Sequence, residues 1–141
     1  MRMMHTMLRV TNLDRALQFY CEVLGMKLLR RKDYAEGRFT LAFVGYGDER
    51  ATTVLELTHN WGTEADPAFK YHDGNAQPQG FGHICFAVPD LDAAVAWFDQ
   101  HQVPYVKRPE QGKMRDVAFI KDPDGYWIEI VEPARLKNLG R

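Results

Sequence analysis

Cysteine is scarce in this sequence, which contains Cys21 and Cys85 alone. Two cysteines with neither a CxxC spacing nor a cysteine-rich cluster do not form a disulfide framework. No apolar run approaches the length that crosses a bilayer, and the stretch MRMMHTMLRV at the start is too short and too polar for a signal peptide. These absences predict a reduced, cytoplasmic setting.

An excess of charge of either sign is also lacking, because the net charge is −1 at pH 7 and the pI is about 6.5. No basic stripe indicates nucleic-acid binding, and no basic amphipathic segment indicates a membrane surface. Core-forming residues are plentiful, since 45% of the 141 residues are apolar and 26% are charged. This composition and length are typical of one globular domain that buries a real core.

The chain contains a weak internal repeat. The segment HTMLRVTNLDRALQFY (residues 5–20) aligns with HICFAVPDLDAAVAWF (residues 83–98) at a constant offset of 78. Each copy opens with the alternation of a half-buried strand, then offers a helix N-cap, and then places apolar residues at helical spacing. The identical pairs are His5/His83, Val10/Val88, Leu13/Leu91, Asp14/Asp92 and Ala16/Ala94.

The order of elements extends this repeat to the whole chain. Each predicted helix, the first ending near Gly25 and the second before Pro104, is followed by three strand candidates separated by turn signals such as DPDG. The chain thus reads β-α-β-β-β twice, an α+β fold within a single domain. We divide it into repeat 1 (about 1–60), a linker loop (61–80), repeat 2 (about 81–133) and a C-terminal tail (134–141). The strand candidates are 27–31, 38–45, 52–58, 105–107, 115–121 and 127–131.

One face of each predicted sheet carries a histidine and a glutamate. Because side chains alternate along a strand, the aliphatic residues of the first and last strands share the face that should meet the helices. The opposite face presents His5 and Glu56 in repeat 1, and His83 and Glu129 in repeat 2. Two neutral imidazoles and two carboxylates suit a divalent ion such as Zn²⁺ or Ni²⁺. With an octahedral preference, two positions would stay open for water or a substrate.

The alternative is that these residues simply face water. A glutamate in an alternating strand is most often on the wet side, and a lone histidine near the start of a chain is usually exposed. The coincidence of residue type and position in two repeats gives the metal site about equal weight with this alternative. A metal would also offset the desolvation cost of Glu129 within the apolar strand WIEIV. His59, His72 and His101 break the repeat, and we predict that they are surface or loop residues.

Two more residues lie on the same faces. Arg9 follows His5 on the same strand face, roughly 13 Å along. It could pair with an internal carboxylate or clamp a carboxylate of a substrate. Cys85 faces the predicted cavity as well, and we interpret it as a small apolar filler rather than a nucleophile, because no base accompanies it locally.

Five segments together carry a resemblance to a known family: HTMLRVTNLDRALQFYCEVLGMKLLR, LELTHNWGTE, YHDGN, GFGHICFAVPD and KMRDVAFIKDPDGYWIEI. Over about residues 5–133 the chain resembles the glyoxalase I family, the lactoylglutathione lyases of the vicinal oxygen chelate superfamily. The resemblance implies two βαβββ modules that form a cupped, eight-stranded mixed sheet flanked by helices in a domain-swapped homodimer. One metal site would then take His5 and Glu56 from one chain and His83 and Glu129 from the other.

The resemblance also implies an activity. Members of the family isomerise the hemithioacetal of glutathione and methylglyoxal to S-lactoylglutathione, which detoxifies methylglyoxal. One divalent metal per site would hold the two adjacent substrate oxygens as a cis-enediolate and act as a Lewis acid. Glu129 would carry the proton from C1 to C2, and Glu56 would do the same for the other stereoisomer of the hemithioacetal.

Further residues receive substrate-binding roles from the resemblance. Arg9 and Asn60 would bind the γ-glutamyl carboxylate of glutathione, and Lys107, Gly112 and Lys113 would hold its glycyl carboxylate. The thioether and methyl pocket would be lined by Met7, Tyr34, Phe43, Met114 and Trp127. Phe43 and Met114 could instead belong to the core, and Lys107 and Lys113 could instead form a solvated face.

The chain departs from the family pattern in two places. It has His5 where the animal enzyme has Gln, which is the bacterial pattern and goes with Ni²⁺ or Co²⁺, yet it has the extended loop at 61–80 that goes with Zn²⁺. We expect Zn²⁺, with Ni²⁺ or Co²⁺ as the close alternative. Gln79 stands where the family often has an Arg that reaches the γ-glutamyl carboxylate.

Two rival functions remain open. A metal-free protein that sequesters drugs, similar to the bleomycin-resistance proteins, would share the topology without the four ligands. The second rival is another metalloenzyme of the same superfamily, such as an extradiol dioxygenase or a thiol transferase. A dioxygenase would use two histidines and one glutamate, which leaves Glu56 without a role. We expect no nucleic-acid or membrane partner.

Overall fold

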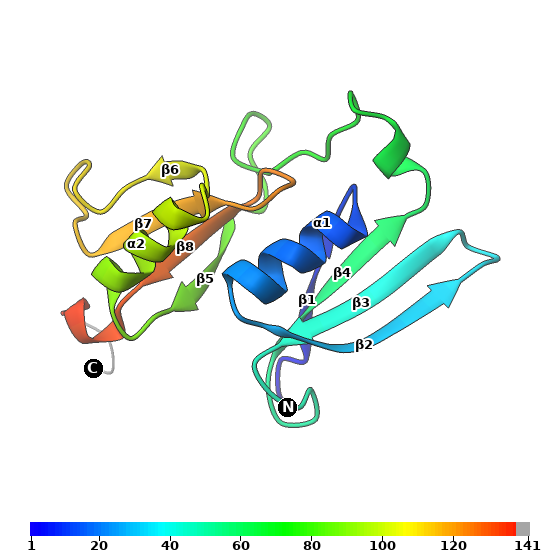
Figure 1. The fold of residues 1–141 in the computed structure, drawn as a ribbon, viewed down its shortest axis with the longest axis horizontal. Coiled ribbons are helices and arrows are strands. Elements are labelled where there is room, and N and C mark those ends of the chain that lie inside the picture. The colour runs from blue at the N-terminus through cyan, green and yellow to red at the C-terminus, as the bar shows by residue number, and fades with distance from the viewer. Residues whose placement is uncertain (138–141) are drawn as a thin grey trace. The chain divides into compact units, whose positions relative to one another are not determined.

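The structure, a computed structural model, describes residues 1–137 and resolves into two compact units, Met1–Tyr71 (unit 1) and His72 onward (unit 2). Both units contain the same succession of elements, as the ribbon shows (Figure 1). Residues 138–141 of the predicted tail lie outside the described residues. None of the helices in the described part of the chain is long and apolar enough to span a membrane.

Unit 1 is a four-stranded mixed sheet with one helical segment. The sheet has the order β1-β4-β3-β2, in which β1 and β4 run parallel and the other neighbours antiparallel. Its elements are β1 (His5–Arg9), α1 (Leu13–Leu17), the π-helical turn η1 (Gln18–Val23), β2 (Lys27–Tyr34), β3 (Phe39–Gly45), β4 (Val54–Asn60) and the short 3₁₀ turn η2 (Thr63–Ala65).

Local chemistry explains where this helical segment begins and ends. The side-chain oxygen of Asn12 accepts a hydrogen bond of 3.0 Å from the backbone N–H of Arg15, which caps the first turn. Gly25 ends the segment with a φ of +72°, a conformation that glycine adopts without steric cost. The side chains that the segment buries are Leu13, Ala16, Phe19 and Tyr20.

Unit 2 repeats this architecture with the strand order β5-β8-β7-β6, and its outer strands pair in the same parallel and antiparallel senses. The carboxylate of Asp90 caps the helix by accepting a 2.9 Å hydrogen bond from the N–H of Ala93. The elements are β5 (His83–Ala87), α2 (Leu91–Gln100), β6 (Tyr105–Lys107), β7 (Val117–Lys121), β8 (Trp127–Val131) and the 3₁₀ turn η3 (Pro133–Arg135).

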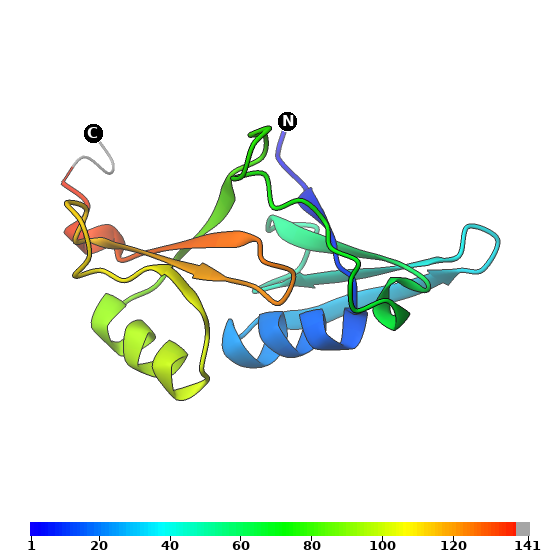
Figure 2. The same ribbon diagram turned by 90° about the horizontal axis from the view of Figure 1, so that it is seen from above.

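Each helix covers one face of its own sheet (Figure 2). In unit 1 this face buries Leu8 and Leu57, and in unit 2 it buries Ile128 and Ile130. The predicted βαβββ repeat is therefore confirmed. Some strand bounds differ from the prediction: β2 runs on to Tyr34, β3 and β4 begin later and β4 reaches Asn60, and β7 begins at Val117.

Candidate metal and substrate site

In unit 1, His5 and Glu56 lie side by side on the sheet face that the helix leaves uncovered. Glu56 on β4 is in register with Met7 on β1, two residues beyond His5. The His5 Nε2 and Glu56 Oε2 atoms are 2.9 Å apart, and the side chains are 39% and 15% exposed. Both groups therefore touch each other and remain open to a ligand.

Unit 2 contains the same pair. Glu129 on β8 is in register with Cys85 on β5, again two residues beyond the histidine. The His83 Nε2 and Glu129 Oε2 atoms are 3.0 Å apart, and these side chains are 39% and 23% exposed. The geometry of unit 1 is thus reproduced nearly atom for atom.

An aromatic ring stands beside each pair. Phe43 on β3 is in register with Glu56, and its ring meets the His5 ring edge-on at 5.7 Å and 81°. Phe119 on β7 is in register with Glu129 and meets the His83 ring at 5.1 Å and 83°. Each histidine is therefore held between a carboxylate and an aromatic edge, which restricts the orientations of its ring.

The donor set fits a divalent metal in chemistry and in spacing. Two ligand atoms about 2.1 Å from one ion and at right angles to each other lie about 3.0 Å apart, which matches both pairs. Within residues 1–137, however, no group of three or more His, Cys, Asp or Glu side chains converges on one point. Each unit thus supplies two donors, fewer than the three or four that protein metal sites use.

Cys85 shares the open face with His83 and Glu129. Partial desolvation of the thiol, followed by the nearby Glu129 carboxylate, raises its pKa to about 11. The thiol is therefore protonated at neutral pH, which agrees with our interpretation that it is not a nucleophile.

Next to Glu56 on the open face of unit 1 lie Arg9, Thr58 and Asn60. Arg9 is in register with Thr58, and the Asn60 amide donates a 3.2 Å hydrogen bond to the Tyr71 hydroxyl. Thr58 is only 8% exposed, and its hydroxyl has no hydrogen-bond partner in the described structure. A buried hydroxyl without a partner is costly and points to a ligand. Our sequence analysis assigned Thr58 no role.

The residues predicted to hold the glycyl carboxylate lie at the end of β6 and in the loop after it. Lys107 is the last residue of β6, and the loop contains Gly112 and Lys113. The Lys107 ammonium donates hydrogen bonds to the backbone carbonyls of Arg108, Met114 and Val117, at 3.1, 2.5 and 2.9 Å. Gly112 has a φ of +71°. Lys107 therefore fixes the loop between β6 and β7, and neither of the two alternatives weighed for it foresaw this role.

The predicted pocket-lining residues divide between the units. In unit 1, Met7 is exposed, Phe43 is buried, and Tyr34 stacks on Phe39 at 4.8 Å. In unit 2, Met114 is exposed on the loop after β6, and Trp127 on β8 meets Phe119 at 6.0 Å. Gln79 lies outside the sheets and donates a weak 3.4 Å hydrogen bond to the Asn75 carbonyl.

One predicted surface residue is placed differently by the structure. His59 lies within β4, not in a loop, and its side chain is only 12% exposed. Its Nε2 is 2.7 Å from Glu64 Oε2, and a local backbone hydrogen bond, followed by the contact with this histidine, lowers the pKa of Glu64. The residue lies on the helix face of β4, where alternation from Leu57 puts it, so the prediction was wrong. His72 and His101 are exposed as predicted.

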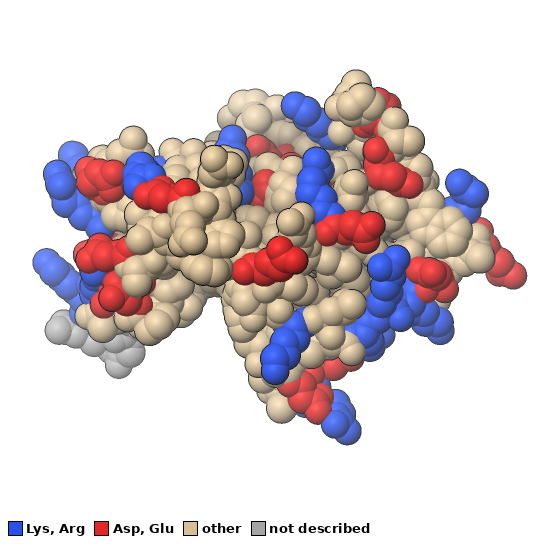
Figure 3. All heavy atoms as spheres, in the orientation of Figure 1, with Lys and Arg blue, Asp and Glu red and all other residues tan. Residues whose placement is uncertain are grey.

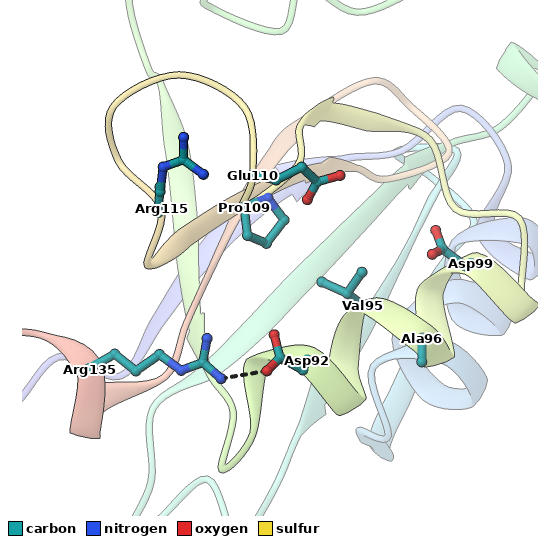
Figure 4. A pocket seen from close by; sticks show the side chains of 8 residues that line it. All are labelled: Asp92, Val95, Ala96, Asp99, Pro109, Glu110, Arg115 and Arg135. Atoms are coloured by element: carbon teal, nitrogen blue, oxygen red, sulfur yellow. Dashed lines mark hydrogen bonds and ion pairs between the residues drawn. The ribbon is translucent and has the colours of Figure 1, made fainter.

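A surface pocket of about 440 Å³ lies in unit 2, and neither His83 nor Glu129 lines it (Figure 4). It combines a 2.9 Å ion pair between Arg135 and Asp92 with further charges of both signs. None of the predicted site residues lines it. Acidic and basic side chains are likewise interspersed over the face of the molecule in Figure 3, in keeping with the net charge of −1. The lining residues are Asp92, Val95, Ala96, Asp99, Pro109, Glu110, Arg115 and Arg135.

Comparisons with known proteins identify the family. The sequence model of the Glyoxalase/Bleomycin resistance protein/Dioxygenase superfamily matches residues 2–130. The chain is 51% identical to a lactoylglutathione lyase of Pseudomonas aeruginosa, covering 97% of this chain and 85% of that one. It is 54% identical to a lactoylglutathione lyase of Neisseria meningitidis serogroup B, covering 94% and 91% of the two chains.

A solved structure agrees with these sequence matches. The trypanothione-dependent glyoxalase I of Leishmania major superposes with a TM-score of 0.79 at 43% identity, covering 94% of this chain and 86% of that one. Fold and sequence agree, and the chain therefore belongs to the Glyoxalase/Bleomycin resistance protein/Dioxygenase superfamily.

Proposed function

We propose that this chain is a lactoylglutathione lyase, a glyoxalase I that isomerises the hemithioacetal of glutathione and methylglyoxal to S-lactoylglutathione. The observation that carries the proposal is the duplicated pair, His5 with Glu56 and His83 with Glu129, on the open faces of two equivalent sheets. Identity of about half with enzymes of that name supports it. A drug-sequestering protein has no need of these ligands.

The four residues of the two pairs would hold one divalent ion. Because each unit supplies only two donors, we propose a homodimer in which unit 1 of one protomer faces unit 2 of its partner, which gives two equivalent sites. Imidazole and carboxylate donors accept Zn²⁺, Ni²⁺ and Co²⁺ alike. We propose Zn²⁺, with Ni²⁺ or Co²⁺ as the alternative, and a cytoplasmic location, where glutathione is the co-substrate.

The bound ion would supply Lewis acidity that makes the C1–H bond of the hemithioacetal easier to deprotonate. Glu129 would take this proton and return it to C2, so that no atom is gained or lost overall. Glu56 would perform the same transfer for the opposite stereoisomer. Phe43 and Phe119 would keep each histidine ring edge-on, and thereby hold the carboxylates within reach of the substrate.

Glutathione would lie along the open faces. Arg9 and Asn60 would bind the γ-glutamyl carboxylate, and the buried hydroxyl of Thr58, which is in register with Arg9, would find its missing partner there. Gly112 and Lys113 would hold the glycyl carboxylate on the loop that Lys107 fixes, and Lys107 could join them by exchanging a carbonyl partner. Met7, Tyr34, Phe43, Met114 and Trp127 would line the thioether and methyl pocket.

Metal reconstitution tests this proposal directly. The metal-free protein is titrated separately with Zn²⁺, Ni²⁺, Co²⁺ and Fe²⁺, and lactoylglutathione formation is followed at each step. We expect activity to appear at one ion per protomer with Zn²⁺, Ni²⁺ or Co²⁺. Inactivity with every ion, or extradiol ring cleavage with Fe²⁺, would instead support a binding protein or a dioxygenase.

A further inference from the structure

A series of direct contacts leads from a surface turn of unit 1 to the His5 ring. The Glu49 carboxylate, in the segment between β3 and β4, contacts the Arg30 guanidinium on β2, with Nε to Oε1 at 2.5 Å and Nη2 to Oε2 at 3.3 Å. The guanidinium carbon of Arg30 lies 3.5 Å from the centre of the Phe43 ring on β3. That ring meets the His5 ring at 5.7 Å and 81°. The last member of the series is a proposed metal ligand.

Arg30 covers the Phe43 ring and is itself fixed by Glu49. Phe43 is only 3% exposed, although it lies on the face of the sheet that the helix leaves uncovered. A planar guanidinium at 3.5 Å covers one face of the ring and is attracted by the ring electrons. Because two guanidinium nitrogens contact the Glu49 carboxylate, a rotation of Arg30 away from the ring would break both contacts.

His5 lies where outside support for its ring matters. It is on β1, an outer strand of the sheet, and its side chain is 39% exposed. Its Nε2 contacts Glu56, a proposed ligand of the same ion, whereas Phe43 restricts the ring without being a ligand. A ligand that is fixed before the metal arrives loses less conformational freedom on binding. Any mobility of the Phe43 ring would therefore be passed on to the histidine.

Unit 2 supports the corresponding ring in another way. Phe119 is in register with Lys107, but the Lys107 ammonium donates its hydrogen bonds to three backbone carbonyls of the following loop. The Phe119 ring instead meets Trp127 on the neighbouring strand at 6.0 Å. A change at Arg30 should therefore affect the histidine of unit 1 and leave His83 as an internal reference.

Resting on the metal site proposed above, we propose that Arg30 and Glu49 are positioning residues that hold the Phe43 ring against His5 and thereby raise the affinity of the site for its divalent ion. The direction of the effect distinguishes this role from a simple effect of charge. A cation repels a divalent ion, so loss of the Arg30 charge alone would tighten metal binding. Loss of positioning weakens it.

Metal affinity, measured by competition with a chromophoric chelator, tests this role without requiring isomerase activity. We expect Arg30→Gln to weaken Zn²⁺ binding about fivefold, less than the 10–100-fold typical of residues that touch a ligand directly. Arg30→Lys keeps a cation over the ring and should restore most of the affinity. Glu49→Gln should weaken binding about threefold, and the double variant no more than Arg30→Gln alone, since the two residues act as one unit.

A matched control and the metal-free protein complete the experiment. Arg31→Gln removes the same charge from the opposite face of β2 and should not weaken Zn²⁺ binding. In NMR spectra of the metal-free protein, Arg30→Gln should change the ring signals of His5 and leave those of His83 unchanged.

The possible outcomes separate this inference from the proposed function. Unchanged or tighter Zn²⁺ binding in Arg30→Gln, equal weakening in Arg31→Gln, or unaltered His5 signals overturns the positioning role alone. A wild type that binds no divalent ion overturns the proposed function and the inference with it.

Discussion

Units 1 and 2 share one row of side chains across their sheets, but the two ends of the row differ. The middle of the row is conserved between the units as a glutamate beside a phenylalanine, with a histidine two residues from the row on the outer strand. At one end stands Met7 in unit 1 and Cys85 in unit 2. At the other end stands Arg30 in unit 1 and Lys107 in unit 2.

This difference between the units distinguishes the requirements of metal binding from those of substrate binding. The proposed metal ion would make the same demand on both pairs, which agrees with their likeness. The proposed substrate is not symmetric, because glutathione would lie to one side of the reacting carbons and the aldehyde side group to the other. The end residues differ accordingly: the Arg30 guanidinium carbon lies 3.5 Å from the centre of the Phe43 ring, whereas the Lys107 ammonium donates hydrogen bonds to three backbone carbonyls.

The strongest test of this comparison exchanges the two carboxylates for amides. We expect Glu129→Gln to lower kcat at least about 1000-fold, since general acid–base catalysis is worth about 10²–10⁴, while the dimer survives. Glu56→Gln should lower kcat less, about tenfold to hundredfold. Turnover and molecular mass in solution are measured for both metal-loaded variants. Near-wild-type turnover of Glu129→Gln would refute the proton-transfer role, and equal losses would show that the units are functionally equivalent.

Substitution of the histidines should have the next largest effect, and the loss of metal affinity should be similar in the two units. His5→Ala and His83→Ala each remove one imidazole donor from a four-residue set. Even residues that only support a ligand are worth about 10–100-fold in metal affinity, so we expect each variant to bind Zn²⁺ more than about 100-fold more weakly. Competition with a chelator measures this. His101→Ala, on the exposed end of α2, is the control and should bind metal normally.

Much of this could be predicted from residues alone, because the signals are local. Asn12 and Asp90 cap helices, Gly25 ends one, and strand alternation sets each glutamate on the face of its histidine. The turn of π-helix at Gln18–Val23 left no such signal. Nor did the partial burial of His59, since pairing with Glu64 across the end of β4 depends on how the chain turns after the strand.

For the site itself, the sequence predicts on which face of its sheet each residue lies, but not which atoms its side chain contacts. Register places Lys107 opposite Phe119, but only the path of the following loop decides that its ammonium binds carbonyls. The Arg30 stack on Phe43 depends on a side-chain conformation that Glu49 selects from a distant turn. Thr58 is likewise evident in the sequence as a strand residue. That its hydroxyl lacks a hydrogen-bond partner follows only from the three-dimensional positions of its neighbours.

Substitution of Arg9 should have a smaller effect and tests a difference between the units, because unit 2 has Ala87 at the equivalent strand position. We expect Arg9→Ala to raise KM for the glutathione hemithioacetal about tenfold with little change in kcat, since one charge-assisted contact to a carboxylate is lost. Arg50→Ala, in the exposed turn before β4, is the matched control. An unchanged KM would show that Arg9 pairs structurally with another part of the protein.

The smallest expected effect on activity comes from Met7 and Cys85, which are in register with the two glutamates on the outer strands. If Cys85 only fills space beside Glu129, then Cys85→Ala should keep kcat within about twofold of wild type, because the thiol, with a pKa raised to about 11, is protonated at working pH. For the same reason iodoacetamide should alkylate Cys85 at pH 8 at least about tenfold more slowly than a free cysteine of pKa about 8.5. The rate should climb as the pH approaches 11, since the thiolate is the reacting form. Fast alkylation at pH 8, or a large loss of activity in Cys85→Ala but not in Met7→Ala, would make the thiol a working part of unit 2 that unit 1 lacks.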